Sequence, residues 1–138
     1  QSKILDTDKI NKYIKSEYSK YSKKNLVIIE GHLSHLLKCC EKVILLRCHP
    51  KKLEKNLDKK NWKKEKIKEN LQAEALDIIL CEIIDIFKPE DIFEIDTTNK
   101  EIGQVSEEII KIIETNFKIM EKYKTGKIDW SVEIIARF

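Results

Sequence analysis

Residues 43–57 read VILLRCHPKKLEKNL, and this stretch decides the fold that we predict. Its first part, VILLRC, is a short run of mostly branched apolar side chains, which is typical of a strand buried in a parallel sheet. His49 and Pro50 follow, and proline favours the first position of a helix. Leu53 and Leu57 recur at a spacing of four, so the predicted helix has one apolar face. A strand followed at once by a helix is the repeating unit of an α/β fold.

Two further apolar runs, LVII at 26–29 and IFEID at 92–96, have the same character and predict two more strands. We expect Trp130 to dock the C-terminal tail onto the rest of the chain. The alternation of strands and helices predicts a single domain over residues 1–138, with a three-layer α/β fold and a parallel sheet. Helical periodicity predicts helices over residues 6–24, 32–40, 63–87 and 97–123, the first capped by Asp6 or Thr7 and the last by Thr98 or Asn99.

Charged residues make up 37% of the chain, but lysines and carboxylates alternate along most segments and the net charge is only +3. Composition alone therefore does not require nucleic acid as a partner. The four cysteines lack CxxC spacing, which indicates free thiols rather than a disulfide framework or a zinc site. Free thiols suit a reducing compartment, and no apolar run reaches the length of a membrane span. We expect a cytoplasmic protein without a membrane partner.

Polar residues follow each predicted strand, at the edge where an open parallel sheet binds its ligands. Glu30 is suited to hold Mg²⁺ through water, and His32 to position a phosphate or a water molecule. The alternative, that Glu30 is an exposed strand end and His32 a helix cap, stays open. We expect His35 to be a surface or capping residue of the short helix. The strand ends that we expect to line one crevice are Glu30, Gly31 and His32, then Arg47, Cys48 and His49, then Asp96, Thr97 and Thr98.

Lysines are concentrated in the stretch DKKNWKKEKIKEN at 58–70, around a break between two helices at Asn61 and Trp62. Three interpretations are open for this basic segment. A run of charges is most simply a solvated face. It could also form a mobile lid that closes over a triphosphate. A third interpretation is a surface that contacts RNA, because lysines bind phosphates and an aromatic ring stacks on bases.

Several motifs in the same order resemble the atypical adenylate kinase family that also acts in assembly of the small ribosomal subunit. They are IIEGHLSHLL, VILLRCHPKKLEKNL, the KKNW break, KIKENLQAEALDIIL and IFEIDTTNK, and the tail YKTGKIDWS is similar to the archaeal branch. The resemblance implies a P-loop nucleoside-monophosphate-kinase-like fold. It also implies transfer of phosphate from ATP to AMP to give two ADP, an associated ATPase activity, and Mg²⁺ as cofactor. The implied partners are a small-subunit ribosomal protein and pre-ribosomal RNA.

The resemblance also assigns roles to individual residues. Glu30 and His32 correspond to a Walker-B-like catalytic element, with Glu30 holding the metal through water. Lys60 stands where the family's lid has an ATP-contacting arginine, within a lid at 59–69, and a lysine keeps that charge but lacks the bidentate fork. The remaining implied nucleotide contacts are Trp62, Thr97, Thr98 and Asn99 for ATP, and Lys59 and Arg47 for phosphate.

The chain departs from the family in one motif. A glycine-rich GxxxxGK[ST] loop cradles phosphates in such kinases, and none of the three glycines, Gly31, Gly103 and Gly126, stands in that setting. The family carries this loop on a strand that precedes the region matched by these 138 residues. We therefore expect an N-terminal segment to be missing, the sheet to lack its first, central strand, and these residues alone to be inactive. A non-catalytic ribosome-assembly or RNA-binding module is the alternative.

Overall fold

A computed structural model describes residues 6–20, 26–118 and 120–135. The chain forms two compact units, residues 1–41 and 42–138. The first unit contains helix α1 (Thr7–Tyr18) and the 3-10 turn η1 (Ser34–Leu36). The second contains both strands and the remaining helices. The organisation as a single domain stays a prediction.

Helix α1 begins as the sequence predicts. The Oδ1 of Asp6 accepts a hydrogen bond from the backbone N of Lys9 at 3.0 Å, which is the geometry of an N-cap. The helix ends at Tyr18, and the last part of the predicted helix, residues 21–24, lies outside the described residues. Asn11 ties α1 to the rest of its unit, because its Oδ1 accepts from the backbone N of Lys38 at 2.9 Å.

The predicted strand at 26–29 is wrong. Residues 26–30 have no regular secondary structure, and the side chains of Leu26 and Ile28 are 55% and 69% exposed. An isolated strand has no ladder to satisfy its backbone groups, and neither described strand pairs with this segment. The short helix predicted over 32–40 is reduced to η1, and His35, expected at the surface, is buried with 4% exposure.

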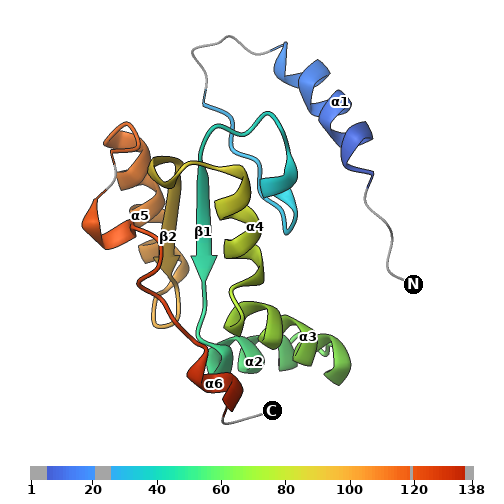
Figure 1. Ribbon diagram of the computed structural model, residues 1–138, viewed down its shortest axis with the longest axis vertical. Helices are drawn as coiled ribbons and strands as arrows, with labels where there is room; N and C mark the ends of the chain where they lie inside the picture. The colour runs from blue at the N-terminus through green and yellow to red at the C-terminus, as the bar shows by residue number, and fades with distance from the viewer. Residues whose placement is uncertain (1–5, 21–25, 119, 136–138) are drawn as a thin grey trace. The chain divides into compact units, whose positions relative to one another are not determined.

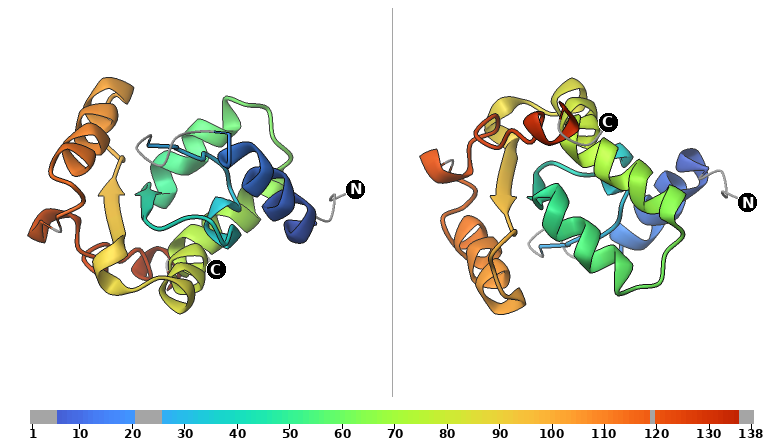
Figure 2. Two further views of the ribbon diagram at one scale, coloured as in Figure 1. Left: turned by 90° about the horizontal axis from the view of Figure 1, so that it is seen from above. Right: turned by 90° about the horizontal axis from the view of Figure 1, so that it is seen from below.

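The second unit is built on two parallel strands, β1 (Val43–Arg47) and β2 (Ile92–Asp96), paired from Val43 with Ile92 to Arg47 with Asp96. Both strands were predicted, and both are confirmed. Figure 1 shows α5 on one side of this pair and α4 on the other, and the view from above in Figure 2 agrees. The three-layer α/β arrangement with a parallel sheet is therefore confirmed.

The two sheet faces pack against different helices because side chains alternate along a strand. Phe93 and Ile95 point to the α5 face, where they form a core with Ile112 and Tyr123, each at most 1% exposed. Tyr123 comes from the 3-10 turn η3 (Glu121–Tyr123). On α4, Leu80 and Ile83 are the buried residues.

The prediction of a single helix over 63–87 is wrong in one respect. The segment forms two helices, α3 (Lys64–Ala75) and α4 (Ile78–Ile86). Asp77 breaks it with a left-handed backbone at φ 55°, which an α-helix cannot contain. The side chain of Asp77 pairs with the guanidinium of Arg47. A contact distant in sequence therefore accompanies the break.

The last predicted helix is shorter than 97–123 and begins later. It is α5 (Ile102–Glu114), and Gln104 accepts from the backbone N of Glu101 at 2.8 Å, so the predicted cap at Thr98 or Asn99 is wrong. Asn116 and Phe117, with φ of 54° and 57°, follow its end. The remaining elements are α2 (Pro50–Asp58), the 3-10 turn η2 (Pro89–Asp91) and α6 (Val132–Ile135).

The core between α5 and the sheet supports a stability prediction. Replacing Ile112 with alanine removes a fully buried side chain and should cost about 2–5 kcal/mol of unfolding free energy, because a cavity remains. The measurement is urea unfolding followed by circular dichroism. Ile110→Ala on the same helix, where the side chain is 51% exposed, is the control and should change stability by less than about 1 kcal/mol. Equal losses in both variants would contradict this packing.

Candidate functional site

The carboxyl ends of β1 and β2 are joined by side-chain and backbone hydrogen bonds. Both the backbone N and the Oγ1 of Thr97 donate to the carbonyl oxygen of Arg47, each at 2.8 Å. The backbone N of His49 donates to the Oγ1 of Thr98 at 2.9 Å. The structure therefore brings together the two predicted strand ends of the second unit, at the edge where parallel sheets bind ligands.

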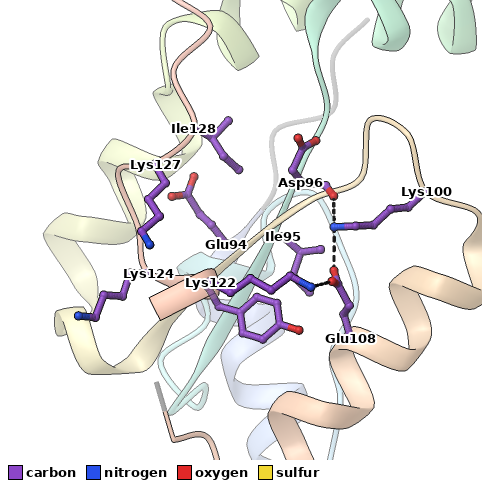
Figure 3. Close-up of a pocket in the computed structure, with 10 residues that line it drawn as sticks. Glu94, Ile95, Asp96, Lys100, Glu108, Lys122, Lys124, Lys127 and Ile128 are labelled. Atoms are coloured by element: carbon purple, nitrogen blue, oxygen red, sulfur yellow. Dashed lines mark hydrogen bonds and ion pairs between the residues drawn. The ribbon is translucent and has the colours of Figure 1, made fainter. Parts of the chain in front are cut away.

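The loop after β2 is ordered by its own side chains. The Oδ1 of Asp96 accepts from the backbone N of Thr98 at 2.9 Å and also from its hydroxyl. Lys100 donates through Nζ to the carbonyl oxygen of Asp96 at 2.6 Å and to Glu108 on α5 at 2.9 Å (Figure 3). Asn99, at the tip, is exposed. The loop is thus held at both ends, and its tip faces solvent.

A cavity of about 190 Å³ lies beside this loop (Figure 3). Its charged lining is mixed, and its ammonium groups are paired with carboxylates: Lys100 and Lys122 with Glu108, and Lys124 and Lys127 with Glu121. Burial disfavours the charged form of Glu108, but hydrogen bonds from Lys122 and Lys100 outweigh burial and lower its pKa below the usual value. Hydrogen bonds from Lys124 and Lys127 lower the pKa of Glu121 to about 2. Because the charges compensate one another, the cavity has no strong preference for an anion.

Arg47 is 1% exposed and lies inside a cluster of carboxylates. Its Nε donates to Glu74 at 2.8 Å and its Nη1 to Glu94 at 2.6 Å, and its Nη2 pairs with Asp77. The Nη2 also donates to the carbonyl oxygen of Glu74 at 3.2 Å. Glu94 in turn accepts from the backbone N of Gly126 at 2.8 Å. The cluster therefore connects β1, β2, the junction of α3 and α4, and the C-terminal segment.

The electrostatics of Arg47 follow from these contacts. Burial alone would lower its pKa, but hydrogen bonding and attraction from Glu74, with Glu94 and Asp77, outweigh burial and raise the pKa above the usual value. Each guanidinium nitrogen already donates to an internal oxygen. The Arg47 side chain is thus engaged within the protein, and its phosphate-binding role stays a prediction. Sequence reasoning missed its three acidic partners, although Glu94 shares a sheet face with Arg47 by register.

The α2–α3 hairpin presents the predicted basic segment. This basic hairpin consists of α2, the turn at 59–63 and α3. Lys59 and Lys60 are exposed, and Asn61 turns the chain with φ 53°. Trp62 is half-buried against the cluster of Leu57, Ile67 and Leu71, and the Nζ of Lys66 lies 4.2 Å from its ring centroid. The break at Asn61 and Trp62 is confirmed, and Trp62 belongs mainly to the core of the hairpin.

Glu30 and His32 belong to the first unit, where both side chains are exposed. Glu30 borders a hollow of about 340 Å³ that is lined mainly by apolar side chains, including Ile14 and Ile28. Within the described ranges 6–20, 26–118 and 120–135, no group of three or more His, Cys, Asp or Glu residues is arranged to hold a metal. In the same ranges, no helix combines the length and apolarity needed to cross a membrane.

Comparison with known proteins identifies relatives, although no family model matches the sequence. The protein named "Putative adenylate kinase" in Archaeoglobus fulgidus is 44% identical over 110 residues, which cover 80% of this chain and 60% of that protein. Proteins of the same name in Methanocaldococcus jannaschii and Pyrococcus abyssi are 35% and 37% identical, over 94% and 92% of this chain. The chain spans 60–66% of the length of these three relatives.

These relatives and the parallel sheet define a P-loop kinase-like α/β protein. The chain belongs to the atypical adenylate kinase family, as the motifs indicated.

The Arg47 cluster supports a prediction about stability. Arg47→Met would leave the carboxylates of Glu74, Asp77 and Glu94 without their shared cation and should cost about 3–5 kcal/mol. Urea unfolding measures the loss. Lys42→Met, which breaks the more exposed pair with Asp91 just before β1, should cost no more than about 1 kcal/mol. A small loss for Arg47→Met would show that the cluster does not support the fold.

Proposed function

We propose that the chain is part of a nucleoside-monophosphate kinase of the adenylate type, which transfers phosphate from ATP to AMP and gives two ADP. The observation that carries the proposal is the junction at the end of β1. There the strand leads through His49 and Pro50 directly into a basic hairpin, beside an ordered loop at the end of β2. Kinases need positive charge on a segment able to close over transferring phosphates, at the ligand-binding edge of the sheet. In a chain related to adenylate kinases, this junction is best suited to ATP.

Lys59 and Lys60 are the proposed phosphate contacts of the hairpin. Both are exposed at its turn, and neither has an ion pair with any described residue. Free ammonium groups can compensate the charge that develops on the transferred phosphoryl group. A lysine acts as a point charge and lacks the fork of arginine, so we expect it to orient the phosphate less tightly.

The loop at 97–99 is the proposed contact for the nucleoside of ATP. The hydroxyls of Thr97 and Thr98 are already engaged in hydrogen bonds with Arg47, Asp96 and His49. Asn99 is exposed at the tip. We therefore expect contact through the Asn99 amide and the backbone, with the two threonines holding the loop in shape. Trp62 is proposed to stabilise the hairpin by packing against its apolar core rather than to stack on the adenine base of ATP.

Glu30 and His32 are the proposed catalytic pair, with Mg²⁺ as cofactor. Mg²⁺ in kinases keeps several waters and is held by one or two carboxylates and the substrate phosphates, and one exposed carboxylate fits that donor chemistry. When bound, the ion neutralises charge on the phosphates. Glu30 would accept hydrogen bonds from metal-bound water, and His32 would orient a water or a phosphate oxygen.

The sequence holds no GxxxxGK[ST] motif, so we expect these 138 residues by themselves to turn over little ATP. An associated ATPase activity belongs to the same proposal. We also propose a cytoplasmic location, which the four free cysteines support.

A role in maturation of the small ribosomal subunit is the second proposed function, with pre-ribosomal RNA and a small-subunit ribosomal protein as partners. The charge distribution supports it. Residues 51–69 hold nine lysines and four carboxylates, whereas the whole chain has a net charge of only +3. All nine lysines are exposed. Such a local excess favours a phosphate backbone.

The kinase proposal predicts a specific effect of the hairpin turn. Lys60→Ala should raise KM for ATP about tenfold, since removing one phosphate contact costs about 1.4 kcal/mol. Lys60→Arg keeps the positive charge and should leave KM for ATP close to the wild-type value. The measurement is ADP formation from ATP and AMP by a purified protein that also contains the P-loop, with its intact mass determined. Lys111→Ala, an exposed lysine on α5, is the control. No AMP-dependent ADP formation by a protein that contains the P-loop would overturn the kinase proposal.

The RNA proposal predicts a different result. Charge reversal at Lys59, Lys63 and Lys64 should weaken RNA binding and reduce the salt slope of log K by about 0.7–0.9 for each phosphate that the variant no longer neutralises. Fluorescence anisotropy with labelled RNA at several salt concentrations measures both quantities. Reversal of Lys111 and Lys118, exposed lysines at and after α5, should change neither. Equal weakening in both sets would indicate non-specific attraction only.

A further inference from the structure

The C-terminal segment packs onto the start of α2. The ring centroids of Trp130 and His49 lie 4.6 Å apart, with their planes tilted by 59°. Glu133 places its Oε1 3.1 Å from the Nζ of Lys51 and 3.5 Å from the Nε2 of His49. The side chain of Glu133 is only 13% exposed. Figure 1 shows α6 beside α2 and α3, and α6 contacts α3 directly.

His49 is the residue on which this contact centres. Its Nδ1 accepts from the backbone N of Lys51 at 3.2 Å, so the imidazole caps α2. A nitrogen that accepts carries no hydrogen, which leaves the proton of the neutral ring on Nε2, the atom nearer Glu133. The carboxylate also lies near the positive end of the α2 dipole and beside an ammonium group. The imidazole N–H, the ammonium group of Lys51 and the N-terminus of α2 therefore all stabilise the carboxylate of Glu133 at the base of the basic hairpin.

The position of His49 gives the contact mechanical importance. The backbone N of His49 is fixed to Thr98 in the loop after β2, whereas α2 begins at the next residue. The basic hairpin thus leaves the sheet at His49, and the C-terminal segment holds both its first turn and α3. A restraint at the base of a hairpin limits the motion of its tip.

The contact between the C-terminal segment and α2 leaves one polar group without a hydrogen bond. The indole Nε1 of Trp130 is buried without a hydrogen-bond partner among the described residues. A buried donor without an acceptor is destabilising, because it gives up its hydrogen bond to water and gains none in return. The packed state is therefore less stable than its ring contact and ion pair would suggest, which favours a reversible contact over a permanent one.

We propose that residues 129–135 form a C-terminal clasp that holds the basic hairpin against the end of β1 and whose release frees the hairpin to move. Trp130 and Glu133 are its positioning residues, and they act through His49 and Lys51. That the motion serves phosphate binding rests on the proposed function. The clasp itself does not.

Hydrogen exchange of the purified, nucleotide-free protein tests the clasp. Trp130→Ala should raise exchange in residues 50–58 about 5- to 30-fold, the range expected when the variant removes one or two kcal/mol of local stability. Glu133→Gln should give a smaller rise in the same residues. Trp130→Phe keeps a ring against His49 and has no indole N–H to bury, so it should preserve protection. Exchange in β1 and β2 should stay within about twofold of wild type, because local opening leaves the sheet intact.

Glu121→Gln is the matched control, since this carboxylate pairs with Lys124 and Lys127 in the same C-terminal region rather than with α2 or α3. It should leave residues 50–58 unchanged. Unchanged exchange there in Trp130→Ala would overturn the clasp, and so would an equal rise across β2, α5 and α2, which would mean global destabilisation. Because no nucleotide is present, failure of the kinase proposal cannot produce either result.

Discussion

A single buried guanidinium organises the second unit of this protein. Arg47 ends β1, is 1% exposed, and donates to carboxylates of α3, of the junction before α4, and of β2. A buried cation is destabilising without oxygen partners, and buried carboxylates are destabilising without a cation. The pairing therefore restricts how these segments can pack against one another. The left-handed backbone at Asp77, an unfavourable conformation for most residues, is held in this context. The helices on this side of the sheet are therefore positioned by charge as well as by apolar packing.

The consequences extend to the carboxyl-end edge of the sheet, where open parallel sheets bind their ligands. Glu94 links Arg47 to the backbone of Gly126, while the carbonyl oxygen of Arg47 accepts twice from Thr97. The loop after β2 is thereby fixed to the strand beside it. The basic hairpin leaves the same edge, and its lysines face solvent. A fixed loop next to a basic segment held at its base is a suitable arrangement for binding a charged ligand and then closing over it.

Local pattern predicted much of the fold. The strands at 43–47 and 92–96, the helix start at Pro50 and the hairpin turn at Asn61 all lie where apolar spacing and turn residues indicated. The docking role expected of Trp130 is also confirmed by its contact with His49. The failure at 26–29 has a clear cause. An apolar run shows that residues are suited to burial, but whether a neighbouring strand is present to pair with them is not a property of the run.

The amino-acid sequence by itself determined strands β1 and β2, the start of α2, the hairpin turn and the family, because periodicity, caps and motifs depend on residues close together in the chain. Only the tertiary structure decided which charged groups are used internally. Arg47 and Lys60 both appeared suited to phosphate, yet one is enclosed by carboxylates from residues 74, 77 and 94, and the other is exposed. The same holds for His35, which is buried, and for the break at Asp77. The physical reason is that burial and charge pairing depend on partners far along the chain, which local spacing does not specify.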